Sequence, residues 1–178
     1  MVKLTLMIKM EMENVTDVVP KDDYEFQMNI MCTSCREQHE NAVSLSSKEE
    51  REMSGSRGTA NFVWRCTHCK KEHSANFIAP TSSSKDLVAP YTSDNAQFQP
   101  LISLDCRGLE PVNFLFTNGA GGSWKAKANQ ETENEDGSRV KNADFEFEID
   151  EDGRWDDYDE ANARTVGVSE VEAKWQRT

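Results

Sequence analysis

Four cysteines form two pairs of the type C-x-x-C. Cys32 and Cys35 make the first pair, Cys66 and Cys69 the second, and 30 residues separate the pairs. One C-x-x-C turn can present two thiolates to one metal ion, and zinc prefers four ligands at tetrahedral corners with Zn–S distances of about 2.3 Å. The spacing therefore predicts one structural zinc ion (Zn2+) held by all four cysteines in a zinc-ribbon-like site. Because four thiolates close the shell, we expect no hydrolysis at this metal.

Other chemistry at these residues stays open. A redox dithiol is typical of a βαβ unit with a helix after the C-x-x-C motif, whereas strand patterns and polar loops surround both pairs here. Iron or copper can also bind thiolate sites. The three histidines, His39, His68 and His73, are alternative ligands, with exposed polar positions as the simpler interpretation. The zinc prediction rests on the cysteines alone.

Basic side chains adjoin the predicted ligands. They are Arg36, Arg65, Lys70 and Lys71. Four thiolates and one Zn2+ carry a net charge of −2, which these cations would screen; the alternative is that they form an ordinary solvated surface. The fifth cysteine, Cys106, lies in a strand pattern, which favours a buried small apolar residue over a reactive thiol.

No enzyme motif accompanies the cysteines. Residues 117–123 (TNGAGGS) are rich in glycine but lack the lysine and the spacing of a phosphate-binding loop. Residues 148–159 imitate a calcium loop, yet two of the carboxylates are of the wrong type and a strand pattern precedes them, so an acidic turn is the better interpretation. Ser–His–Asp and H-E-x-x-H arrangements are also missing. We therefore expect no catalytic residues.

Strands must position the cysteines, because apolar and polar residues alternate along most of the chain. The first segment, residues 1–12, places Leu4, Leu6, Ile8 and Met10 on one face, which indicates a half-buried strand. Further strands are predicted at 24–31, 60–66, 73–78, 98–106, 143–149 and 165–175. A short helix is predicted at 156–164, and residues 129–142 form a charged loop. The expected fold class is mostly β.

A faint internal repeat relates two parts of the chain. Residues 8–20 (IKMEMENVTDVVP) can be laid on residues 102–114 (ISLDCRGLEPVNF), which places Asn14 on Gly108. We therefore expect two related β-sheet halves, sandwich-like or barrel-like, around a pseudo-twofold axis. The predicted organisation is a single domain, 1–178, with a zinc-bearing β lobe at 1–80, a connection at 81–97 and an acidic β lobe at 98–178.

The charge of the chain restricts its partners. The 178 residues carry a formal net charge of −12. Residues 1–90 contain 11 basic and 13 acidic residues, whereas residues 91–178 contain 9 and 19. Such acidity argues against duplex nucleic acid and anionic membranes as partners. No apolar run is long enough to span a membrane, and the first segment does not resemble a signal peptide, so we expect reduced thiols and a cytoplasmic location, extending to the nucleus.

Specific strings add a family resemblance. They are Glu13-Asn14-Val15-Thr16, the two C-x-x-C pairs with Gly58-x-Ala60 before the second, DCRGLEPV at 105–112, and WDDYDE at 155–160 followed by Val166-Gly167-Val168. With these strings the chain resembles the eukaryotic CXXC-motif-containing zinc-binding proteins over nearly its whole length. The resemblance implies a mostly β protein of two related halves with one zinc on Cys32, Cys35, Cys66 and Cys69, and no established catalytic activity. The acidic loop at 129–142 is longer than is typical of that family.

The expected function is a non-enzymatic, monomeric zinc protein that acts as a protein-interaction module. The residues predicted for a partner surface are Arg107, Glu110, Trp155, Asp157 and Tyr158. Exposed, such residues bind partners strongly; buried, they would pack a corner of the fold. A metal-handling or thiol-redox protein is the first alternative, and a nucleic-acid-binding zinc ribbon that uses Arg57, Arg65, Lys70 and Lys71 is the second.

Overall fold

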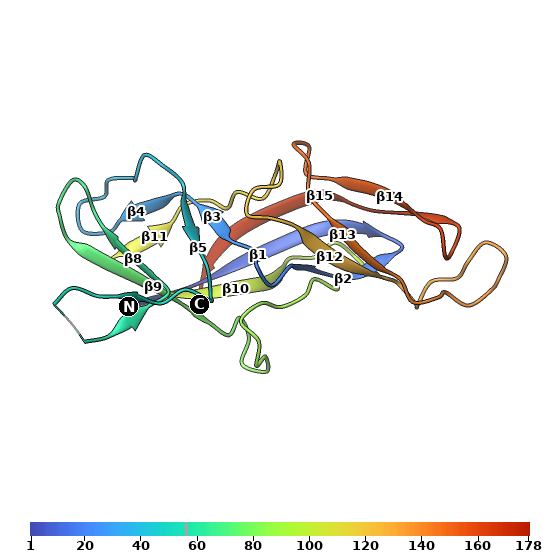
Figure 1. Cartoon of the computed structure of the whole chain (residues 1–178), viewed down its shortest axis with the longest axis horizontal. Coiled ribbons are helices and arrows are strands. Elements are labelled where there is room, and N and C mark those ends of the chain that lie inside the picture. Colours follow the sequence, from blue (N-terminus) through green and yellow to red (C-terminus); the bar gives the residue numbers. More distant parts are fainter. Residues whose placement is uncertain (56) are drawn as a thin grey trace.

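Antiparallel strands build the whole fold. The computed structural model describes residues 1–55 and 57–178, and in these residues it contains strands and loops without a helix. The largest sheet has six strands in the order β14-β15-β1-β10-β9-β8 and curls into a half-barrel (Figure 1). Its strands are β1 (Val2–Glu13), β8 (Phe62–Arg65), β9 (Glu72–Ile78), β10 (Gln99–Arg107), β14 (Trp155–Asp159) and β15 (Arg164–Arg177). The predicted mostly β fold class is confirmed, and the described residues offer no helix that could cross a membrane.

Among the described residues, four smaller sheets accompany the six-stranded sheet. A three-stranded sheet has the order β13-β12-β2, and β11-β4, β3-β5 and β6-β7 are two-stranded. Their bounds are β2 (Val15–Pro20), β3 (Phe26–Met28), β4 (Ile30–Cys32), β5 (Val43–Leu45), β6 (Arg51–Glu52), β7 (Thr59–Ala60), β11 (Leu109–Pro111), β12 (Trp124–Ala128) and β13 (Asp144–Phe147). In Figure 1, β4 and β11 lie at the same end as β8, whereas β12 and β13 lie at the end of β14.

The core runs through both ends as one cluster. Leu6, Ile8 and Met10 of β1 are at most 1% exposed, which is the face that the alternation predicts. Trp124 is fully buried and packs edge-on against Tyr24, with ring centroids 5.4 Å apart. Because both central strands, β1 and β10, contribute to this cluster, neither end of the molecule has a separate core.

The two central strands are interrupted in the same way. β1 ends before Asn14, which has φ 59°, and β10 ends before Gly108, which has φ 84°. After each left-handed residue the chain enters a short strand of a different sheet, β2 or β11. The carbonyl of the left-handed residue accepts a backbone hydrogen bond of 3.0 Å at each break. The donor is the amide of Asn129 at Asn14 and the amide of Thr33 at Gly108. These positions are the ones that the predicted repeat superposes.

Matching hairpins flank the central strands. β9 and β8 follow β10 on one side, and β15 and β14 follow β1 on the other. The β8–β9 connection carries Cys66 and Cys69, and the β14–β15 connection carries Asn162 next to Asp159. The parallel supports the expected pseudo-twofold relation, which stays a prediction, as do the lobe boundaries at 80/81 and 97/98. The short strands β2 and β11 each pair with a strand from the other predicted half.

One predicted element is wrong. Residues 156–164 were expected to form a short helix, but β14 extends to Asp159 and a turn leads into β15 at Arg164. Asp156 to Asp159 pair with Gly167 to Arg164 along β15, so ladder hydrogen bonds replace those of a helix. The long partner strand thus outweighs any local helix preference at 156–159, and residues 160–163 form the tight turn between the two strands. The chain ends are close together, because the amide of Thr178 donates to the carbonyl of Lys3 at 3.1 Å.

Candidate metal centre

Each C-x-x-C pair sits in a tight hairpin turn with the same backbone geometry. The amide of Arg36 donates to the carbonyl of Cys32 at 2.8 Å, and the amide of Lys70 donates to that of Cys66 at 2.9 Å. Both Arg36 and Lys70 are left-handed, with φ 64° and 66°. The left-handed residue reverses the chain directly after the second cysteine, so both thiols of a pair point to the same side of the turn. Two equivalent metal-binding knuckles result.

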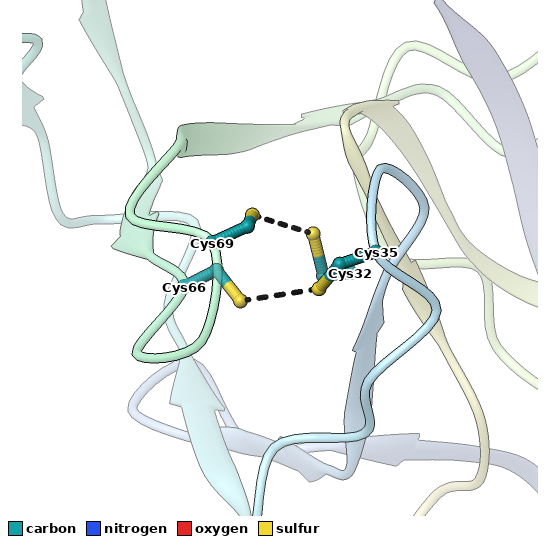
Figure 2. A group of neighbouring side chains, drawn as sticks. All are labelled: Cys32, Cys35, Cys66 and Cys69. Atoms are coloured by element: carbon teal, nitrogen blue, oxygen red, sulfur yellow. Dashed lines mark hydrogen bonds between the residues drawn. The ribbon is translucent and has the colours of Figure 1, made fainter.

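The four thiols face one another between the two knuckles (Figure 2). Cys32 Sγ lies 3.7 Å from Cys69 Sγ, and Cys35 Sγ lies 3.7 Å from Cys66 Sγ. All four sulfur atoms lie within 4.8 Å of one another, and all four cysteines are free thiols. Four ligands at 2.3 Å from a tetrahedral ion are about 3.8 Å apart. The thiols are therefore spaced for one zinc ion.

The electrostatics of the cluster also favour a cation. Backbone amides of Cys69 and His68 donate to Cys66 Sγ and lower its pKa to about 7. At Cys35 the amide of Glu37 acts in the same direction, but burial and the adjacent thiols outweigh it and raise the pKa to about 12. Negative charges on sulfur atoms that lie within 4.8 Å of one another repel, so a cation between them is favoured. Zinc supplies that charge when bound, and the four cysteines are the residues that would hold it.

The neighbouring basic residues are exposed, and two of them, Arg65 and Lys70, donate hydrogen bonds to backbone carbonyls. The Arg65 guanidinium donates to the carbonyl of Lys70 at 2.8 Å and lies 3.4 Å from Glu72. The Lys70 ammonium donates to the carbonyl of Thr67 at 2.7 Å. These contacts brace the second knuckle. Arg36 and Lys71 are exposed, as the solvated-surface interpretation expects.

His73 is the functional residue that sequence reasoning missed. It is 6% exposed, and its Nε2 lies 3.1 Å from Cys32 Sγ. Burial, together with the charge of Lys71, lowers the pKa of this imidazole. Its default interpretation as an exposed polar residue is wrong, whereas His68 is exposed and His39 half-buried. The cluster of metal-ligating groups in the described residues contains the four cysteines and no histidine. The alternation of β9, which buries His73 beside Ala75, was the only available signal.

The residues predicted for a partner surface fall at two places. Arg107 and Glu110 belong to the end with the zinc knuckles, where Glu110 pairs with Arg177. Trp155, Asp157 and Tyr158 belong to β14 at the opposite end (Figure 1). Trp155 is half-buried and stacks on Phe147 at 4.1 Å, whereas Tyr158 is 52% exposed. The five residues do not make one continuous surface.

The remaining candidates have structural roles. Cys106 is 1% exposed, and burial together with the charges of Asp105 and Glu110 raises its pKa to about 12, as the buried-residue prediction expects. The glycine-rich turn at 117–123 packs on Tyr24, whose hydroxyl donates to the carbonyl of Ala120 at 2.9 Å. In the calcium-like segment, Asp150 accepts the amides of Asp152 and Arg154 and closes an acidic turn.

Comparison with known proteins agrees with this geometry. A family model described as "CXXC motif containing zinc binding protein, eukaryotic" matches residues 5–176. The chain belongs to this family. A member from Nematostella vectensis, a UPF0587 protein, is 31% identical over 178 residues, covering 98% of each chain. The CXXC motif containing zinc binding protein of Homo sapiens is 28% identical over 171 residues, covering 95% of this chain and 94% of that one.

Solved structures extend the likeness to the fold. The crystal structure of C1orf123 superposes with a TM-score of 0.78 at 27% identity and covers 99% of both chains. A hypothetical protein from Plasmodium falciparum superposes with a TM-score of 0.74 at 23% identity, covering 99% of this chain and all of that one, and shows the same fold. The family name and the four-cysteine cluster together support one bound zinc ion per chain.

Proposed function

We propose that the protein is a non-enzymatic zinc protein in which the metal holds two hairpin turns together. The observation that carries this proposal is the closed shell of four cysteine sulfurs within 4.8 Å of one another. Zinc in such a shell keeps no position for water or substrate, so it acts as a crosslink between the knuckles. The turns at 32–37 and 66–71 follow strands of different sheets, β4 and β8, and a metal crosslink stabilises short segments of this kind.

The second part of the proposal is that the protein serves as an interaction module. β14 supports this role, because it is an edge strand of the six-stranded sheet and presents Asp157 and Tyr158 to solvent. An exposed tyrosine beside carboxylates is a suitable anchor for a protein partner with basic residues. The unsatisfied edge of β14 adds main-chain groups that an extended segment can pair with.

Affinity capture with matched variants tests the interaction role. Partners recovered with the wild-type chain should be lost with Tyr158→Ala and kept with Leu87→Ala, which truncates an exposed apolar residue elsewhere. Both variants should retain the wild-type melting temperature. Equal recovery with all three chains, or no reproducible partner with any, would refute a role for this strand.

A metal-handling or redox function is the alternative that one observation favours. Cys35 and Cys69 are half-buried, whereas Cys32 and Cys66 are buried, so one cysteine of each knuckle is partly exposed to a chelator or oxidant. Metal loss with full retention of the fold would support metal handling. Cooperative loss of structure at both knuckles on chelation would support the structural role.

The acidic charge guides the remaining expectations. We propose a monomer in the cytoplasm and nucleus that does not use nucleic acid as its main partner. Sedimentation gives the oligomeric state directly. Binding to single-stranded or duplex nucleic acid that is measurable at low salt and weakens as the salt concentration increases would favour the zinc-ribbon alternative.

A further inference from the structure

The two knuckles differ in what contacts their buried sulfur atoms. Cys32 and Cys66 occupy equivalent positions, and both are at most 2% exposed. Cys66 Sγ accepts backbone amides from its own turn. Cys32 Sγ meets the imidazole of His73, whose Nε2 lies 3.1 Å away on a strand 41 residues further along the chain. This imidazole contact thus distinguishes two otherwise similar turns.

The position of His73 is fixed from several sides. It is buried to 94% and pairs with Trp64 across the β8–β9 hairpin, with ring centroids 5.7 Å apart. On another side the imidazole lies directly on Gly108. A Cβ atom at Gly108 would come within 1.9 Å of His73 Nδ1, which no real pair of atoms allows. Gly108 is therefore required both by its φ of 84° and by the ring that covers it.

Gly108 also holds the first knuckle through its backbone. Its carbonyl accepts the amide of Thr33 at 3.0 Å, inside the C-x-x-C turn. The same residue thus fixes the turn that carries Cys32 and leaves room for the histidine that contacts the Cys32 sulfur. This gives the CRGLEP segment a concrete role at the metal centre, although it contributes no ligand.

We propose that His73 is a positioning residue that donates a hydrogen bond from Nε2 to the Cys32 thiolate, and that Gly108 is the cradle that admits it. The hydrogen bond fixes the direction of the Cys32 side chain before metal arrives and withdraws electron density from the sulfur. It therefore keeps Cys32 in place as a zinc ligand and lowers its reactivity toward electrophiles. The inference rests on the proposed four-cysteine zinc site.

Paired substitutions at His73 test the hydrogen bond. His73→Leu removes the donor, His73→Gln returns an N–H near the same position, and His39→Phe is a control at the other ring that packs on Trp64. Loss of an interaction that orients a ligand costs roughly tenfold in metal binding. We expect zinc transfer to a chromogenic chelator to be about tenfold faster in His73→Leu than in wild type. His73→Gln should recover much of the difference, and His39→Phe should match wild type.

Replacing zinc by cobalt gives a spectroscopic signal that reports on the sulfur ligands and that a general loss of rigidity in the protein would not change. A hydrogen bond to a thiolate stabilises its lone pairs, so its loss should shift a sulfur-to-cobalt charge-transfer band to lower energy in His73→Leu and leave it in place in His73→Gln. Mass mapping after brief alkylation should also show faster modification of Cys32 in His73→Leu. Unchanged spectra and zinc transfer in a folded, zinc-binding His73→Leu would overturn the proposal while leaving the four-cysteine site intact. Failure of wild type to bind zinc would instead refute the site itself.

The role of Gly108 follows from a double-mutant comparison. Gly108→Ala should accelerate zinc transfer because the new methyl group displaces the imidazole. In a His73→Ala background the same substitution should change the rate much less, since the ring is already absent. Equal effects in both backgrounds would show that Gly108 acts through backbone conformation alone. If Gly108→Ala does not fold, the His73 variants still decide the hydrogen bond.

Discussion

At the residue scale, the metal centre depends on the backbone of two residues that are not ligands. Arg36 and Lys70 follow the second cysteine of each pair in the left-handed region. Non-glycine residues there cost about 1 kcal/mol, so the turn carries local strain. Bringing two thiolates to the same side of each turn requires this reversal, and zinc binding offsets the strain.

Cys106 provides a prediction about thiol reactivity. Its pKa is raised to about 12, first by burial and then by Asp105 and Glu110, so roughly one thiol in a thousand is ionised at pH 9. Alkylation of the folded, zinc-loaded protein at pH 7 to 9 should leave Cys106 unmodified, as mass mapping can establish. Because the folded pKa exceeds the unfolded one, its stabilising contribution is full below about pH 8.5 and is lost as pH rises toward 12.

The control for that prediction is the unfolded chain, in which Cys106 should react like any other thiol. Rapid modification of Cys106 in the folded protein would contradict its burial and favour a reactive role. Slow modification that speeds up only with denaturant would agree with the structure.

The sequence predicts the metal ligands well and their surroundings poorly. Spacing alone identifies the four cysteines because each C-x-x-C turn is local. His73 escapes prediction because its contact with Cys32 spans 41 residues and depends on how β9 lies against the first knuckle. Gly108 is recognisable as part of a characteristic string, but its contact with a histidine is visible only in three dimensions.

At the scale of elements, two different kinds of side-chain cluster connect a hairpin turn to a neighbouring loop, one at each end of the molecule. The β8–β9 turn is joined to the first knuckle by cysteines. The β14–β15 turn is joined to the loop at 129–142 by polar side chains: Asn162 contacts Asp159 at 2.7 Å, the carbonyl of Lys141 at 3.0 Å and Asn134 at 3.3 Å. Asp159, Asn162 and Asn134 are all at most 9% exposed. This polar cluster does at one end what zinc is proposed to do at the other.

Asp159 is the residue that tests the polar cluster. Asp159→Ala removes the two hydrogen bonds that Asn162 donates to the carboxylate, one from its backbone amide and one from its side chain, and hydrogen bonds to charged groups contribute about 2 kcal/mol each. Urea unfolding should therefore show a loss of about 2 kcal/mol or more in the free energy of unfolding. Asp157→Ala, on the exposed part of the same strand, should change it by less than about 0.5 kcal/mol. Equal effects for the two variants would mean that the cluster is not stabilising.

Strands were predictable where one face is buried and one is not. The alternation at residues 1–12, 98–106 and 165–175 corresponds to β1, β10 and β15. The helix expected at 156–164 failed because pairing with a long neighbouring strand overrides local preference. β2 and β11 each pair with a strand of the other predicted half. This pairing depends on one left-handed residue before each short strand, which the alternation of apolar and polar residues does not reveal.

At the scale of the whole molecule, metal removal should affect the two knuckles and the shared core differently. Since one apolar cluster runs through both ends, chelation should leave most strands folded. Hydrogen exchange should rise at 32–37 and 66–71 and stay at its zinc-loaded level in β14 and in β15 up to Val168. The melting temperature should fall because zinc binds the folded state.

Two results would contradict that expectation. Uniform loss of protection would mean that zinc stabilises the whole core rather than two turns. No change at either turn would mean that the thiols are positioned without metal and that the site is suited to exchange.

Metal content tests the central claim most directly. Protein purified without added metal should contain about one zinc ion per chain by elemental analysis. Cys106→Ser, which removes the cysteine outside the cluster, should also contain about one, whereas Cys66→Ser should contain little or none after brief dialysis against a chelator. Wild type that cannot bind zinc, or Cys66→Ser that retains it as tightly as Cys106→Ser, would contradict a site built from all four cysteines.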